Sequence, residues 1–249
     1  MTWKAVETLP ICIGDPIQRA RAEAVSAALL TRVLPLARLV HGRAEPLATA
    51  SLIVDGDSLA LLTAAHVFEH ATAGDLAIPL PRDGGWACLR SMQTRVIVHP
   101  TRDIALVILN DRSQVRRLWS NWVPVPASHL ESGTQGRGAR TYVVAGYPLA
   151  QARRIDGAVC MRPVVVFTRA LDDECYRYTR TAERIDGLDI HTPALDGVSG
   201  GLVWEVDDDD SRDFGCQLRA ASMQVAFVHG RHLRTEPLVA AHLLVSRLR

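Results

Sequence analysis

From about residue 32 onward, the sequence is a succession of short apolar runs, many of them β-branched, with turn residues between them. No helical pattern alternates with these runs, which disfavours a parallel sheet of βαβ units. Asp55-Gly56 lies between two of the runs and is a hairpin signal. The sequence therefore predicts an all-β fold, with antiparallel strands packed as a sandwich or barrel. The runs read ATASLIVDGDSLALLTAA, DLAIPL, TRVIV, DIALVIL, TYVVAGY, RPVVVFTRAL, GGLVWEV and LRAASMQVAFV.

The N-terminal segment has a different residue pattern. Asp15 and Pro16 are typical of a helix N-cap and first helical residue, and an Ala- and Leu-rich stretch follows to about Leu30. Pro35 then argues against helix continuation. We expect residues 1–31 to form an N-terminal extension with a helix, outside the main fold.

The C-terminal segment predicts a second helix. Thr235 is a candidate cap, and apolar residues recur on one helical face through residues 237–249. The loop-rich segment 110–140 is expected to connect two halves of the fold. We expect the closing helix to pack on the second half.

Composition limits the classes of function. The net charge is +1, and the Lys and Arg residues are scattered, so nucleic acid is not an expected partner. No apolar run is long enough to span a bilayer, so no membrane partner is expected. The five cysteines are widely spaced and no secretory leader begins the sequence, which together favour reduced thiols and a cytoplasmic location.

Three motifs carry the chemistry of a nucleophilic hydrolase. His66 ends LLTAAH, Asp103 begins DIALVIL, and Ser199 lies in DGVSGG. A serine hydroxyl becomes a nucleophile when an imidazole takes its proton, and a buried carboxylate holds that imidazole in one tautomer. The glycines around Ser199 allow a tight turn that aims N–H groups at one point. The N–H groups of Gly197 and Ser199 are the predicted oxyanion donors.

In their order along the chain, TAAH, DIALV and GVSGG resemble the chymotrypsin/trypsin-like serine peptidases, in the style of bacterial HtrA-like and short trypsin-like members. VVAGYP at 143–148 resembles the start of their second barrel. The resemblance covers roughly residues 32–249. It implies two antiparallel six-stranded β-barrels, the first over about 32–112 and the second over about 140–236, with the active site between them. It implies a serine endopeptidase that acts on a protein or peptide substrate and needs no cofactor or metal.

Carried over by motif, the resemblance makes His66 the base, Asp103 the orienting acid and Ser199 the nucleophile. It also implies a set of substrate-binding residues, which are Pro193, Asp196, Ser222, Met223 and Gln224.

Several positions depart from the family's pattern. Val67 replaces the cysteine that follows the histidine in secreted members, and Pro193 stands where a carboxylate would favour basic substrates. Val198 replaces an aspartate that, in zymogen-type members, binds a newly formed N-terminus. Activation by that ion pair is therefore not expected. We expect residues 1–31 to pack on the barrels or to contact a regulatory protein partner.

Two alternatives stay open at this stage. His66, Glu69 and His70 spell H-x-x-E-H, which is a zinc peptidase signature when it lies on a helix. The strand-like residues before His66 leave little room for that helix. The second alternative is a non-catalytic or latent binding module on a protease scaffold, because a fold does not guarantee a function.

Overall fold

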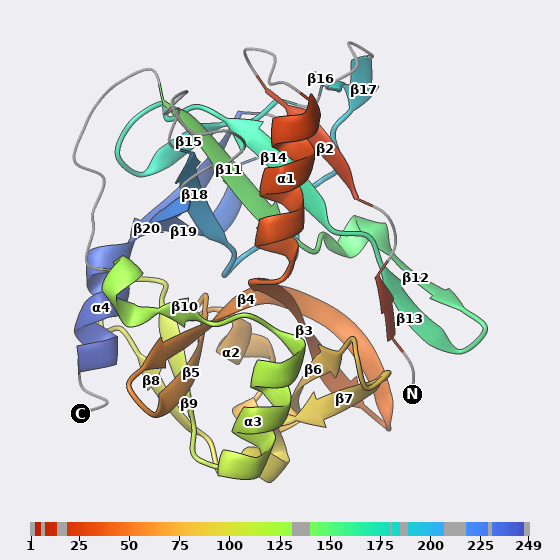
Figure 1. Cartoon of the computed structure of the whole chain (residues 1–249), viewed down its shortest axis with the longest axis vertical. Helices are drawn as coiled ribbons and strands as arrows, with labels where there is room; N and C mark the ends of the chain where they lie inside the picture. The colour runs from red at the N-terminus through yellow and green to blue at the C-terminus, as the bar shows by residue number, and fades with distance from the viewer. Residues whose placement is uncertain are drawn as a thin grey trace.

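The computed structural model describes residues 3–5, 8–13, 19–130, 140–179, 181–184, 189–206, 218–228 and 231–246. The described chain is mostly strand and forms two large sheets, with a small third sheet and helices beside them (Figure 1). The all-β prediction is confirmed at this level. Of the helices in this part of the chain, none combines the length and apolar character that a bilayer crossing needs.

The first sheet has the strand order β7-β6-β3-β4-β5-β9-β8, and β10 pairs with β4. Its seven ordered strands are antiparallel to their neighbours, and β10 is parallel to β4. The predicted hairpin is confirmed, because Asp55 pairs with Ser58 across a turn in which Gly56 has a φ of 57°. The strands are β3 (Val33–Val40), β4 (Arg43–Asp55), β5 (Ser58–Thr63), β6 (Leu76–Leu80), β7 (Gly85–Cys88), β8 (Arg95–Val98), β9 (Ala105–Leu109) and β10 (Val125–Pro126).

The second sheet has the order β15-β20-β19-β18-β11-β14-β2-β16-β17. Its strands are β2 (Leu9–Cys12), β11 (Thr141–Gly146), β14 (Val164–Thr168), β15 (Cys175–Arg177), β16 (Thr181–Arg184), β17 (Asp189–His191), β18 (Leu202–Val206), β19 (Leu218–Val228) and β20 (His232–Pro237). The small sheet joins β1 (Trp3–Ala5), β12 (Ala152–Ile155) and β13 (Ala158–Met161).

The N-terminal segment lies within the second sheet, which corrects the expectation that residues 1–31 stand outside the main fold. Strand β2 runs between β14, to which it is parallel, and β16, to which it is antiparallel. Ile11 and Ile13 are buried there, so the sheet removes their apolar surface from water. Helix α1 (Arg19–Leu30) follows and crosses in front of β11 and β14 in Figure 1. Asp15 and Pro16 lie outside the described residues.

The implied pair of six-stranded barrels is not confirmed. The described strands form sheets of eight and nine members, and the inserted β2 is one reason for the larger number in the second sheet. Only the coarser expectation of antiparallel β-structure in two halves follows from the structure.

The buried position of β2 leads to a stability prediction. Ile11→Ala is expected to lower the free energy of unfolding by about 2–5 kcal/mol, because it leaves a cavity in the buried apolar cluster on the face of the second sheet. Ile155→Ala is the matched control, since that side chain in β12 is 53% exposed. Urea unfolding followed by far-ultraviolet circular dichroism measures both changes. Equal, small losses in the two variants would contradict the buried placement.

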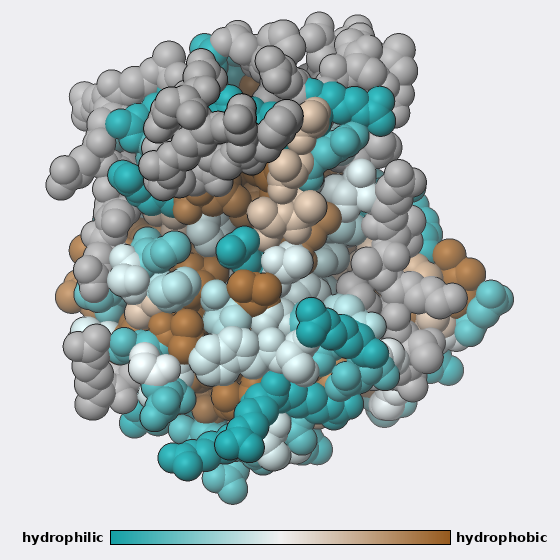
Figure 2. Space-filling model, in the orientation of Figure 1, coloured by the Kyte–Doolittle hydropathy of each residue, from teal (hydrophilic) through white to brown (hydrophobic). Residues whose placement is uncertain are grey.

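A third helix was not anticipated. The segment 110–140 was expected to be loop-rich, but α3 (Arg112–Asn121) lies in it. Asp111 caps the helix by accepting the N–H groups of Ser113 and Gln114, and of its own side chains only Leu118 is buried. Val115, Leu118 and Trp119 nevertheless recur at helical spacing on one face, and the rest of the helix is polar. Figure 2 shows hydrophilic side chains where α3 lies at the lower edge.

The C-terminal helix is shorter than predicted. Helix α4 covers Leu238–Val245, and Pro237 is its N-cap. Thr235 does not cap it, because Thr235 belongs to β20 and pairs with Gln224 of β19. Residues 247–249 lie outside the described chain.

Two apolar clusters hold the sheets together. The larger is continuous from the first sheet to α1, α4 and the inner faces of β11, β18 and β19. The smaller lies within the second sheet and includes Ile11, Ile13, Leu195 and Val198. The loop that carries Ser199 thus has its anchor residues in the second sheet.

Candidate active site

His66 lies immediately after the end of a buried strand. Strand β5 ends at Thr63, Ala64 is buried, and His66 precedes the four-residue helix α2 (Val67–His70). The Val67 side chain is buried and fixes the start of that helix. The imidazole of His66 is partly exposed, as a group that meets a substrate must be.

Asp103 binds His66 at two points. Its Oδ2 is 2.7 Å from His66 Nδ1, and its Oδ1 accepts the His66 backbone N–H at 2.9 Å. The contact follows from strand register, because Thr63 pairs with Ala105 between β5 and β9. His66 follows β5 and Asp103 precedes β9, so this antiparallel pairing brings both residues to the same end of the two strands. The double contact fixes the imidazole plane and leaves Nε2 facing away from the carboxylate.

The electrostatics of the pair favour a charged carboxylate and a basic imidazole. The hydrogen bond to Asp103 raises the pKa of His66, partly opposed by burial, and the Glu69 and Arg234 charges raise and lower it respectively. Burial raises the pKa of Asp103, but the hydrogen bonds from the His66 ring and backbone outweigh burial, so the pKa lies below its ordinary value. The pKa shifts of the two groups therefore favour the charged form of the carboxylate and the protonated form of the imidazole.

Ser199 lies in a loop that contacts β4 of the first sheet, close to the end of β5 that leads to His66. The Thr49 N–H donates to Ser199 O at 3.0 Å, and Thr49 Oγ1 donates to Gly197 O at 2.8 Å. Thr63 Oγ1 in turn donates to Thr49 O at 2.9 Å. Thr49 and Thr63 therefore join the Ser199 loop to the strand that leads into His66.

Gly200 shows how closely the loop approaches. A Cβ at this position would lie 2.2 Å from Thr49 O and 2.5 Å from Thr63 Oγ1, and its φ is 91°. Only glycine fits both the backbone conformation and the space. The motif after Ser199 is therefore a contact between the two halves and not a flexible turn.

The Ser199 hydroxyl donates to Val225 O of β19, at 3.1 Å. Within the described chain, no hydrogen bond joins Ser199 Oγ to His66. The serine is thus held in a resting rotamer, and a rotation about one side-chain bond changes its partner. Sequence reasoning did not anticipate Val225, because a backbone carbonyl acceptor has no residue-type signature.

The backbone N–H groups of Gly197 and Ser199, the two predicted oxyanion donors, belong to peptides whose orientation the structure describes. The Asp196 C=O accepts the Leu149 N–H at 2.7 Å, so the N–H of the same peptide, which belongs to Gly197, points away from Leu149. Gly197 has a φ of 90°. Among the described residues, the N–H groups of Gly197 and Ser199 have no protein acceptor, whereas those of Val198 and Gly200 do.

The predicted substrate-binding residues are distributed unevenly. Pro193 is half-buried and its carbonyl accepts the Tyr178 hydroxyl, while Asp196 is exposed in a turn. Ser222, Met223 and Gln224 are buried in β19. Gln224 is the one of these three whose backbone contacts the Ser199 loop, through the N–H of Gly200 and the carbonyl of Gly201. Their role in substrate binding stays a prediction.

The zinc interpretation lacks the helix that it requires. Helix α2 begins after His66 and has four residues, and His66 Nδ1 is engaged by Asp103. In the described ranges, no three His, Cys, Asp or Glu residues gather in a group that fits a metal ion. His66 is instead held by Asp103 through its ring and its backbone.

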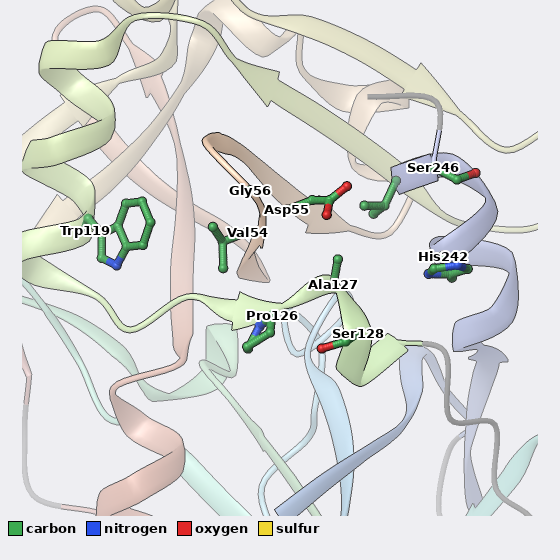
Figure 3. A pocket seen from close by; sticks show the side chains of 10 residues that line it. Val54, Asp55, Gly56, Trp119, Pro126, Ala127, Ser128, His242 and Ser246 are labelled. Carbon is green, nitrogen blue, oxygen red and sulfur yellow. The ribbon is translucent and has the colours of Figure 1, made fainter. Parts of the chain in front are cut away.

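One cavity of about 520 Å³ lies apart from these residues, between the β4–β5 turn, α3, η3 (Ala127–Leu130) and α4 (Figure 3). Figure 3 shows Trp119 on one side and His242 on the other. None of the predicted site residues lines it. Its lining is Val54, Asp55, Gly56, Trp119, Pro126, Ala127, Ser128, His242, Val245 and Ser246.

Comparison with solved structures finds a similar fold in the Vibrio cholerae VesB protease, with a TM-score of 0.54. The similarity covers 96% of this chain and 68% of that chain, at 14% sequence identity. No family model matches the sequence, and no curated protein does so. At this identity the likeness shows a shared fold alone.

Proposed function

We propose that this chain is a serine endopeptidase that cleaves peptide bonds through an acyl-enzyme. The observation that carries the proposal is the two-point contact of Asp103 with His66. The Ser199 loop contacts the same sheet through Thr49, near the end of β5 that leads to His66. The fold shared with a protease supports the same reaction class. His66 is the base, Asp103 its orienting acid and Ser199 the nucleophile.

In the proposed reaction, the Ser199 hydroxyl leaves Val225 O and turns to His66 Nε2. The imidazole takes the hydroxyl proton as Oγ bonds to the peptide carbonyl carbon, and Asp103 stabilises the imidazolium. The N–H groups of Gly197 and Ser199 bind the oxyanion. The C–N bond then breaks, and His66 returns the proton to the leaving amine. A water molecule, deprotonated by His66, releases the acyl group in the same way.

A second candidate is a latent or non-catalytic protease scaffold. The observation that favours it is the hydrogen bond from Ser199 to Val225 O, which keeps the hydroxyl off the imidazole. In a latent enzyme, a bound partner shifts the hydroxyl to His66. In a binding module, the hydroxyl never makes that contact.

Labelling with a fluorophosphonate probe tests the proposal. We expect an adduct on the peptide that contains Ser199, found by mass spectrometry, with the same yield in the presence of a metal chelator. Ser199→Ala is expected to lose the adduct, and Ser128→Ala, which changes an exposed serine at the remote cavity, is expected to keep it. An unlabelled wild type supports the scaffold, and peptide cleavage that a chelator abolishes without labelling revives a metal mechanism.

A further inference from the structure

A group of charged side chains lies directly behind Asp103. Arg102 Nη1 donates to Glu174 Oε1 at 2.9 Å and to Glu236 Oε2 at 3.1 Å. Glu236 Oε1 lies 3.4 Å from the Asp103 backbone nitrogen and accepts its N–H. One carboxylate therefore contacts both the arginine and the backbone of the residue that orients His66.

The members of this group come from both halves of the molecule. Arg102 and Asp103 lie in the turn between β8 and β9 of the first sheet, while Glu236 lies in β20 of the second. Glu174 precedes β15, and its carbonyl accepts the N–H and the hydroxyl of Thr235 at 2.8 and 3.0 Å. The two glutamates are thus attached to one backbone unit, and Arg102 joins that unit to the first sheet.

Burial makes the charge balance of this group important. The Glu236 side chain is only 10% exposed, whereas Arg102 and Glu174 are 39% and 49% exposed. A buried carboxylate is costly unless a cation and hydrogen bonds compensate it. Arg102 supplies the cation and the Asp103 N–H supplies a further hydrogen bond. The exposed Glu174 adds less, because solvent screens its charge.

We propose that Arg102 and Glu236 form an ion-pair clasp between the two sheets, in which Glu236 is a positioning residue that holds the backbone of Asp103 in place. This inference rests on the proposed function of the His66–Asp103 pair. The clasp acts through Asp103 and touches neither substrate nor the reacting atoms. It sets where the Asp103 carboxylate lies relative to the imidazole and keeps the charge beside it balanced.

The clasp predicts shifts of opposite sign in the pH dependence of labelling. The charged groups that face His66 are Asp103, Glu69 of α2 and Arg234 of β20, with the clasp behind Asp103. Arg102→Gln leaves an unbalanced carboxylate there, which stabilises the imidazolium and moves the midpoint to higher pH. Glu236→Gln removes one negative charge and leaves Arg102 paired with Glu174 alone, which moves the midpoint to lower pH. The double variant loses one charge of each sign, so its net charge equals that of the wild type, and its midpoint is expected to return toward the wild-type value.

Labelling rates measured at a pH where His66 is fully deprotonated separate the positioning effect of Glu236 from the effect of its charge. Glu236→Ala removes the acceptor for the Asp103 N–H and is expected to slow labelling about tenfold, since a displacement of about 1 Å costs up to about a hundredfold. Glu236→Gln keeps an oxygen acceptor and is expected to recover most of that rate. Arg117→Gln is the matched control, because it breaks a 2.7 Å ion pair with Asp83 on another part of the first sheet. We expect it to change neither rate nor midpoint.

Proton NMR titration of the His66 ring makes the test independent of activity. If the wild type does not label, the proposed function fails, and the titration midpoints of the same variants still test the clasp. Midpoints that move in opposite directions for Arg102→Gln and Glu236→Gln support it. Midpoints that do not move, or that move as they do in Arg117→Gln, overturn it, as does equal labelling in Glu236→Ala and the wild type.

Discussion

Asp103→Asn is expected to slow labelling of Ser199 by about four orders of magnitude, as loss of the orienting carboxylate does in a serine triad. An asparagine amide cannot accept at both of its terminal atoms, so it disrupts the contact that selects the His66 tautomer. The pH dependence also changes. His66 must be neutral to accept the proton, and Asp103 is the main cause of its raised pKa. The midpoint of the rise in labelling with pH is therefore expected at lower pH in the variant.

Stopped labelling reactions across a pH series measure both effects, with the labelled fraction read by gel fluorescence. Asp75→Asn is the matched control, because Asp75 also accepts hydrogen bonds from a nearby backbone N–H and side chain but lies away from the site. It is expected to leave the rate and the midpoint unchanged. A variant at Asp103 that labels as fast as the wild type would remove that residue from the mechanism.

Gly200→Ala is expected to reduce labelling at least about a hundredfold, because the loop must move away from the first sheet. The new Cβ would meet the Thr49 carbonyl and the Thr63 hydroxyl at distances that no real contact allows. Backbone strain and overpacking together are expected to lower the free energy of unfolding by about 2–5 kcal/mol. The site is thus lost through displacement of Ser199 and not through removal of a reacting group.

Gly157→Ala separates the effect of backbone strain from the effect of overpacking. Gly157 also has a positive φ, 77°, but an added Cβ would meet nothing within 4 Å. It is expected to cost about 1 kcal/mol of stability and to leave labelling unchanged. Urea unfolding and probe labelling of the two variants, side by side, decide the matter. If Gly200→Ala labels like Gly157→Ala, the loop does not dock as described.

The contact between His66 and Asp103 was predictable, because each residue flanks a short apolar run and the two runs pair in the sheet. The hairpin at Asp55-Gly56 was predictable for the same kind of local reason. Helix α3 was missed although Val115, Leu118 and Trp119 have helical spacing, because most of its other residues are polar and the segment was interpreted as a loop. Thr235 was misread because a threonine before Pro-Leu suggests a cap, although strand pairing with β19 dominates there.

The remaining parts of the candidate site depend on long-range contacts that leave no local signal. Nothing near Glu236 in sequence indicates that its carboxylate meets the backbone of Asp103. The Val225 carbonyl that binds Ser199 is a backbone group, which any residue type supplies. For Val198, the sequence predicted only part of what the structure shows. Its apolar side chain excluded an ion pair at this position. Its burial in one cluster with Ile11 and Ile13 could be known only from the folded structure.

The insertion of β2 has a consequence for the order of events during synthesis. Leu9 pairs with Val164, and Ile11 pairs with Arg184, so a strand made early by the ribosome waits for partners that emerge much later. Pairings between such distant segments form slowly. In the described part of the chain, strands β16 and β17, which precede the Ser199 loop, join the rest of their sheet through β2 alone. The segment that leads to Ser199 is therefore placed, in the described chain, through strands that depend on this slow long-range pairing of β2.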